Sequence, residues 1–258
     1  MATAKSEVTN MILLSALAAG TLALAANPAN ADDWSFQIEP YLIGLMIDGD
    51  AGIGRVEGVD LDVDTSDILD ALDMAGMVHF EAHHESGWGF ALDYAFLDLS
   101  DDLSGPRGGV LDAEVSEGVF EALLIKGTGS GDEGLDYIGG LRWWNIEVDV
   151  EIDPVILPGT VSSSLDEDWV DVFVGARWRN PINEKWTFSL RGDVGAGAAD
   201  FTWHVWSGFR YKFGNSKSLD LGYRALGVDY EDGTPGEPGY FMYDTVTHGP
   251  FIGLMFGF

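Results

Sequence analysis

The segment WGFALDYAFLDL, residues 88–99, alternates between two kinds of side chain. One row is apolar and aromatic and consists of Trp88, Phe90, Leu92, Tyr94 and Phe96. The positions between them are mainly small and include one acid, in the run Gly89, Ala91, Asp93, Ala95, Leu97. Because successive side chains of a β-strand point to opposite faces, this spacing predicts a strand with one apolar face.

The same two-residue period recurs along most of the chain after residue 33, for example in WTFSLRGDVGA at 186–196 and LDLGYRALG at 219–227. A tilted strand needs roughly 9–11 residues to cross a bilayer. Ten candidate strands reach that length: 34–48, 74–84, 88–99, 114–126, 135–149, 168–179, 185–196, 202–213, 218–230 and 240–258.

The two faces of these strands favour a membrane barrel over a soluble sandwich. The apolar faces begin or end on Trp, Tyr or Phe, as the aromatic girdles of transmembrane barrels do. The opposite faces combine acids with arginines, which suits a narrow polar lumen. We therefore predict an all-β fold, a single antiparallel up-and-down transmembrane barrel of about ten strands, with twelve or eight as alternatives.

The connections alternate in length. Short turns are predicted at 85–87, 129–134, 180–184 and 214–217, and longer acidic loops at 49–73, 100–113, 150–167 and 231–239. Bacterial barrels place short turns on the periplasmic side and long loops outside. Within the first loop, residues 53–64 are interpreted as an extension of the first hairpin, and 66–73 as a short helix with Ser66 as its N-cap.

Composition and the first residues indicate the compartment. The formal net charge of −30 argues against a nucleic-acid partner, because phosphate binding needs clustered Lys and Arg. Residues 11–31 form an apolar run that ends in Ala29-Asn30-Ala31, the pattern of a secretory signal peptide. We predict a signal peptide at 1–31, cleaved after Ala31, followed by a barrel domain at 32–258 located in a Gram-negative bacterial outer membrane.

The last segment, HGPFIGLMFGF at 248–258, places Ile252, Leu254, Phe256 and Phe258 on one strand face. This resembles the C-terminal strand of bacterial outer-membrane barrels, and the whole pattern is similar to the small OmpA-like and OmpW-like class. The resemblance implies that Phe258 and Phe256 belong to the signal recognised by the barrel-assembly machinery. It also implies contact with outer-membrane lipid and lipopolysaccharide.

Because alternate residues of a strand face the same side, the strand pattern assigns a set of charged side chains to the lumen, and Asp136 is among them. We expect a polar network, either a selectivity lining or interior salt bridges, made of Glu39, Glu81, Asp93, Glu121, Asp171, Arg142, Arg177, Arg191, Asp193, Arg210, Asp220 and Arg224.

Metal binding and catalysis are the other kinds of chemistry that the sequence could support. His79, Glu81 and His83 share one strand face and could hold a transition metal or act as a proton switch, but no second ligand cluster accompanies them. No nucleophile–base motif is evident beyond His204 with Ser207 and Thr247 with His248. We expect no metal, no cofactor and no catalytic residue, with weak divalent-cation binding at the acidic outer loops.

Two functional hypotheses remain. The first is a porin-like barrel that passes or binds a small solute. The alternative is a structural or surface-interaction barrel whose lumen is closed by salt bridges. A lipid-modifying enzyme of the outer membrane is a third hypothesis, and we do not expect the protein to be an enzyme.

Overall fold

The structure is a computed structural model that describes residues 33–104, 110–128, 133–153, 161–214, 216–237 and 239–258. The predicted signal peptide at 1–31 lies outside these residues. The described elements are β1 (Trp34–Ile43), β2 (Met46–Ile53), β3 (Val56–Val63), α2 (Thr65–Ala71), β4 (Leu72–His84), β5 (Trp88–Ser104), β6 (Val110–Gly127), β7 (Gly134–Asp153), β8 (Val161–Pro181), β9 (Trp186–Gly197), β10 (Phe201–Lys212), β11 (Lys217–Asp232) and β12 (Phe241–Gly257).

Ten strands close into an antiparallel up-and-down barrel. β1 and β4 to β12 are hydrogen-bonded in sequence order, and β12 pairs back with β1 through Gln37 opposite Gly257 and Tyr41 opposite Gly253. This confirms the predicted ten-stranded barrel. β2 pairs with the first half of β12, and β3 pairs with β2 alone, so residues 53–64 extend a hairpin and add no barrel strand.

The first barrel strand is interrupted between β1 and β2. Pro250 of β12 lies at this level and has no N–H to give to the ladder. Its carbonyl instead accepts a hydrogen bond from Gly44 N at 2.8 Å. A side chain on Gly249 would meet the Gly44 carbonyl at 1.9 Å, so glycine is required where the two backbones cross. The interruption lets one chain segment pair with both halves of β12.

The barrel exterior carries an apolar band next to the short turns. Phe256, Leu254 and Ile252 of β12 and the next residue, Phe258, all face outward, and Phe258 is 60% exposed. Outward Trp, Phe, Leu and Val side chains continue around β5 to β11. We call the part of each strand within this band the spanning part, for example 88–96 in β5 and 170–178 in β8. This is the architecture of bacterial outer-membrane barrels.

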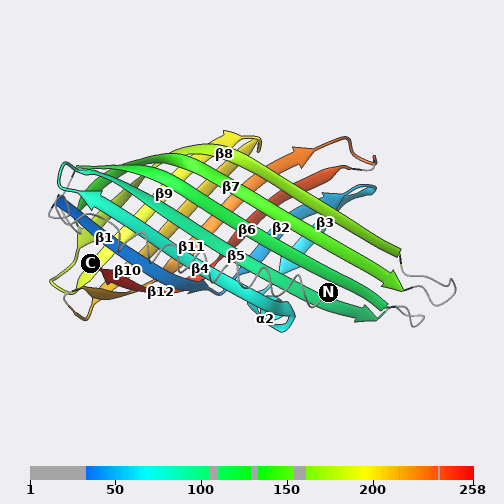
Figure 1. Cartoon of the computed structure of the whole chain (residues 1–258), viewed down its shortest axis with the longest axis horizontal. Helices are drawn as coiled ribbons and strands as arrows, with labels where there is room; N and C mark the ends of the chain where they lie inside the picture. The colour runs from blue at the N-terminus through cyan, green and yellow to red at the C-terminus, as the bar shows by residue number, and fades with distance from the viewer. Residues whose placement is uncertain (1–32, 105–109, 129–132, 154–160, 215, 238) are drawn as a thin grey trace. The chain divides into compact units, whose positions relative to one another are not determined.

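Six strands run well past this band. β5 to β8 have 17, 18, 20 and 21 residues and β11 and β12 have 16 and 17, whereas β9 and β10 have 12 each. Figure 1 shows β7 and β8 extending beyond the ends of β9 and β10. The loops predicted at 100–113 and 150–167 were therefore wrong in most of their length, because their acids alternate with apolar residues and continue the sheet.

The polarity of the two faces reverses where the strands leave the band. Outward positions turn acidic at Asp98 of β5 and Asp168 of β8, while inward positions turn apolar at Leu97 and Trp169. Two adjacent apolar residues mark each reversal, as in Phe96-Leu97, Trp143-Trp144 and Trp169-Val170. We call the part beyond this level the distal extension: β2, β3, α2 and the far ends of β5 to β8, β11 and β12.

The distal extension has an apolar interior. Trp144 and Trp169 stack with centroids 5.5 Å apart, and Trp169 stacks on Tyr230 at 4.0 Å. Phe241 and Tyr243 add two more rings to this cluster, which also contains aliphatic side chains. Burying these aromatic rings stabilises the extension in water as a core does in a soluble barrel. The lumen at this level is filled by side chains.

α2 contributes Ile68 to a second apolar cluster, with Leu45, Met77 and Leu97. The predicted N-cap at Ser66 was wrong by two residues. Asp64 caps the helix, because its carboxylate accepts from the backbone N–H groups of Ser66 at 2.7 Å and Asp67 at 3.1 Å. Among the described residues, no helix has the length and hydropathy needed to cross a membrane.

Candidate functional site

The inward side chains of the spanning parts form a charged network inside the barrel. The lumen holds eight buried carboxylates: Glu39, Glu81, Asp93, Glu121, Asp136, Asp171, Asp193 and Asp220. They face six arginines: Arg142, Arg177, Arg179, Arg191, Arg210 and Arg224. These are six of the eight arginines in the sequence. The twelve residues assigned to a lumen network all lie in this interior.

Arg142 and Arg191 hold the centre of the network. Arg142 Nε donates to Glu121 at 2.8 Å, its Nη2 to Asp193 at 2.8 Å, and its Nη1 to the Thr202 hydroxyl at 2.8 Å. Arg191 donates to the same two carboxylates at 2.8 and 2.9 Å. Both carboxylates are thus shared between two guanidiniums, and both carboxylate side chains are at most 1% exposed.

A second cluster lies toward the short turns. Arg177 donates to both oxygens of Glu81, at 2.7 and 2.6 Å, and to Asp136 at 2.8 Å. Arg179 adds a hydrogen bond to Asp136 at 3.1 Å. Bidentate guanidinium–carboxylate pairs of this kind fix geometry more tightly than a lysine could. They join β4, β7 and β8 across the lumen.

The remaining charges form two smaller groups. Arg210 donates to Asp220 at 2.6 and 2.9 Å and lies 3.6 Å from Glu39. Arg224 donates to the Tyr41 hydroxyl at 2.7 Å, and Tyr41 donates to Asp93 at 2.8 Å.

Asp171 lies apart from these groups. Its carboxylate accepts the Ala199 backbone N–H at 2.9 Å. It therefore holds the short link between β9 and β10.

The predicted His79, Glu81 and His83 group is brought together by hydrogen bonds. His79 contacts Asp93 through Nδ1 at 3.0 Å and Glu81 through Nε2 at 3.1 Å, and His83 Nε2 contacts the other oxygen of Glu81. A neutral imidazole has only one N–H, so a proton must be added for both contacts of His79 to be hydrogen bonds. In the described part of the chain, no cluster of three or more such ligands has a metal-binding geometry.

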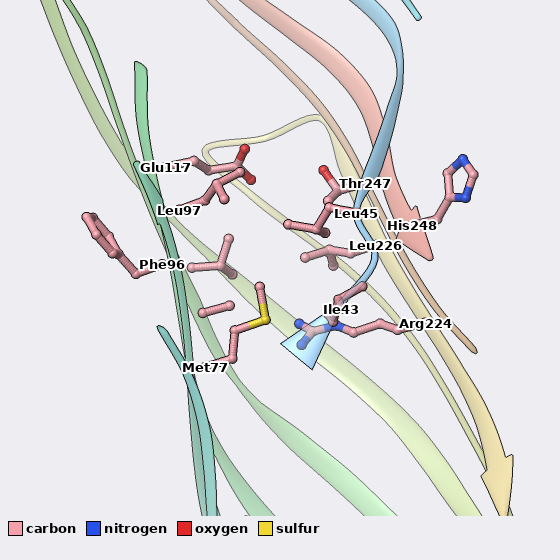
Figure 2. A pocket seen from close by; sticks show the side chains of 12 residues that line it. Ile43, Leu45, Met77, Phe96, Leu97, Glu117, Arg224, Leu226, Thr247 and His248 are labelled. Atoms are coloured by element: carbon pink, nitrogen blue, oxygen red, sulfur yellow. The ribbon is translucent and has the colours of Figure 1, made fainter. Parts of the chain in front are cut away.

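An apolar cavity of about 40 Å³ lies inside the barrel at the start of the distal extension. Figure 2 shows Leu97 on one wall and Leu45 and Leu226 on the other pointing toward one another. Glu117 points into the same space and accepts a hydrogen bond from the Tyr243 hydroxyl at 3.1 Å. His248 points away from the cavity, so this histidine and Thr247 do not act on a common site.

A larger, polar cavity of about 100 Å³ lies among the charged groups of the spanning part. Its walls include Tyr41, Arg191, His204, Trp206 and Arg224. Sequence reasoning omitted Tyr41 and Arg179 and considered His204 only as a catalytic base. Arg179 has the same parity as Arg177, so its inward position was available from the pattern. The cavity itself was not, because it depends on which side chains pair across the lumen.

No family model and no curated protein matches this sequence. The solved structures similar to it include a Pseudomonas aeruginosa FadL homologue, at 10% identity and a TM-score of 0.37 over 88% of this chain and 90% of that chain. The translocator domain of the autotransporter NalP from Neisseria meningitidis has 14% identity and a TM-score of 0.38 over 98% and 97%. Neisserial surface protein A has 12% identity and a TM-score of 0.27 over 86% and 96%. At these scores the function has to be inferred from the barrel's own geometry.

Proposed function

We propose that this protein is an integral barrel of the bacterial outer membrane that is closed to solutes and displays its acidic distal extension outside the cell. The single observation that carries the proposal is the filling of the lumen at two levels. Arg142 and its carboxylates fill one level of the spanning part, and the Trp144–Trp169–Tyr230 stack fills one level of the extension. A barrel of eight strands is just wide enough for side chains to fill, and ten strands lie close to that limit.

The proposed orientation places the short turns and the C-terminal strand in the periplasm, as in other barrels of this kind. Residues 1–31 would be removed as a signal peptide before insertion. Lipid and lipopolysaccharide would contact the apolar band, and the assembly machinery would recognise Phe258 and Phe256. The acidic extension faces the medium and would recruit divalent cations weakly as a screening layer.

Conductance in planar bilayers tests the proposal against its main competitor, a small-solute channel. We expect purified, folded protein to show no current steps at ±100 mV, because neither charged nor apolar plug leaves a continuous water path. Folding is checked first by heat-modifiable gel mobility, and a known porin inserted in the same bilayer shows that the assay detects channels. Stable, reproducible steps from the folded protein would contradict a closed lumen and support the channel.

Cell fractionation tests the location. We expect the protein in the outer-membrane fraction with Asp32 as its N-terminal residue. A folded soluble pool in the periplasm would contradict membrane insertion.

A further inference from the structure

The polar cavity in the spanning part is large enough for more than one water. Its volume is about 100 Å³, whereas a single buried water needs roughly 10–15 Å³. Barrel interiors are normally packed to high density, so a void of this size among charged groups needs an occupant. The groups that face it indicate which chemistry that occupant should have.

His204 is the first indication. Its side chain lines the cavity and is only 4% exposed, and neither ring nitrogen has a hydrogen-bond partner among the described residues. The nearest carboxylate oxygens, on Asp193 and Glu121, are 3.6 and 3.7 Å from Nδ1, beyond hydrogen-bond distance. A buried imidazole without partners costs folding free energy unless a bound molecule supplies them.

Two arginines on the same wall have N–H groups that form no hydrogen bond with the described residues. Arg224 uses Nη1 for Tyr41 and Asp93, and none of the described residues engages its Nε or Nη2. Arg191 uses Nε and Nη2, which leaves Nη1 without a described acceptor. The wall therefore offers N–H groups in excess, and a ligand that fits it must supply acceptor oxygens.

Four carboxylates line the cavity, and three of them, Glu81, Asp93 and Asp220, already accept hydrogen bonds from neighbouring side chains, so they do not need the N–H groups that a ligand would use; the fourth, Glu39, lies 3.6 Å from Arg210. Glu81 already receives two hydrogen bonds from Arg177 and contacts with two histidines, and Asp220 receives three hydrogen bonds from Arg210. Asp93 receives Tyr41 and His79. The lumen as a whole has two more carboxylates than arginines, so a dianion would be repelled more strongly than a monoanion.

Part of the wall is apolar and aromatic. Trp206 and Phe251 line the cavity and lie with ring centroids 5.3 Å apart. We propose that this cavity binds a small monocarboxylate with a compact apolar body. Its carboxylate would accept hydrogen bonds from Arg224 and Arg191, with His204 completing the polar side, and its body would pack on Trp206 and Phe251.

The ligand would enter from the short-turn end. Side-chain exposure falls from 23% at His83 and 16% at Arg177 to 0% at Arg142 along the lumen. The aromatic stack closes the other end of the barrel. A ligand can bind from one end of a lumen that is closed at the other end. The binding site therefore does not depend on whether the barrel conducts.

Titration calorimetry on the folded protein in detergent tests the site. Sodium acetate, propionate and benzoate are the probes, benzyl alcohol is the uncharged analogue of benzoate, and inorganic phosphate is the non-carboxylate anion. We expect at least one carboxylate to bind with one molecule per barrel, and benzyl alcohol and phosphate to bind about tenfold more weakly or not at all. Arg224→Lys and His204→Leu should each weaken carboxylate binding about tenfold.

Arg142→Lys is the matched control. It damages the same network, but all three nitrogens of Arg142 are engaged and the residue does not line the cavity. The affinity of the Arg142→Lys variant for the carboxylate should stay within about twofold of the parent's affinity. Gel mobility shows first that each variant is folded. Trp206→Leu offers a second route, because it removes the apolar contact without touching a charge. The proposal is overturned if folded parent protein binds none of the carboxylates, if benzyl alcohol binds as tightly as benzoate, or if Arg224→Lys and Arg142→Lys are equally affected.

Discussion

At the scale of the residue, Arg142 shows what the lumen network contributes to stability. Its guanidinium is fully buried and forms ion pairs with both Glu121 and Asp193. Arg142→Met leaves both carboxylates short of a partner, and removing one partner of a buried ion pair costs about 3–5 kcal/mol. We expect urea unfolding in detergent, followed by tryptophan fluorescence, to show a loss of that size.

Arg55→Met, in the turn between β2 and β3, removes the same charge from an exposed position. It should change stability by no more than about 0.5 kcal/mol. Equal losses in the two variants would show that the buried network stabilises the barrel no more than a surface charge does.

Most of the charged lumen could be predicted, because parity alone decides which side chains face inward. Asp93 follows Trp88 by an odd number of residues, and so it lies on the face opposite the outward apolar row. Parity does not say which charges meet across the lumen. Glu81 and Arg177 are 96 residues apart in sequence, and their contact depends on the curvature and closure of the whole sheet. For the same reason, the sequence pattern could not show that Nε and Nη2 of Arg224 lack acceptors among the described residues.

At the scale of the element, β12 closes the barrel. Phe258 N donates to Phe36 O at 2.9 Å, Phe36 N donates to Phe258 O at 3.1 Å, and the two rings stack at 5.9 Å. We expect Phe258→Asp to reduce the amount of assembled protein strongly. Its effect on a barrel that has already formed should be small, because a charge near the membrane interface costs only about 0–1 kcal/mol. Heat-modifiable gel mobility of membrane fractions measures the assembled amount.

Phe213→Asp is the control for this strand. Phe213 lies in the turn after β10, at the same end of the barrel, and is 53% exposed against 60% for Phe258. Parental assembly of Phe258→Asp, or an equal loss in both variants, would contradict a specific role for the terminal strand.

The strands could be predicted where one polarity pattern continued along them. The predicted strands were too short where the polarity of the two faces reversed. In β7 the outward face changes from Leu141 and Trp143 to Glu147, while the inward face changes from Arg142 to Ile146. The two-residue period continues, and only the environment of each face is exchanged. The doublet Trp143-Trp144 was the available signal, since two adjacent large aromatics cannot both belong to one face of a strand.

At the scale of the whole molecule, the distal extension concentrates negative charge outside the band. Partial burial, together with Asp166 and Asp149, raises the pKa of Glu147, and burial, together with Asp244 and Asp200, raises the pKa of Asp229. A raised carboxyl pKa means that the folded state binds the proton more readily than the unfolded state. This contribution to stability is complete below the unfolded pKa of about 4 and is lost as pH rises through the folded pKa.

We therefore expect the distal extension to become more stable as pH falls from neutrality toward the unfolded pKa of about 4. Hydrogen exchange of its amides, corrected for the intrinsic pH dependence, measures this locally. The double variant Asp166→Asn with Asp244→Asn removes one neighbouring carboxylate from each group and should flatten the response. Protection that decreases as the pH is lowered would contradict the assignment to these carboxylates. A pH response of the double variant equal to that of the parent would contradict it as well.

The withdrawal of six arginines into the lumen has a consequence for proteolysis. Trypsin cleaves after Arg and Lys, and in the described residues the cations outside the lumen are Arg55 and a group at the short-turn end, Lys126, Lys185, Lys212 and Lys217. On intact cells, the described part of the extension would offer trypsin only the peptide bond after Arg55. A protease that cleaves after acidic residues would find targets all around the exposed rim. The pair of enzymes would thus report which end of the barrel faces the medium.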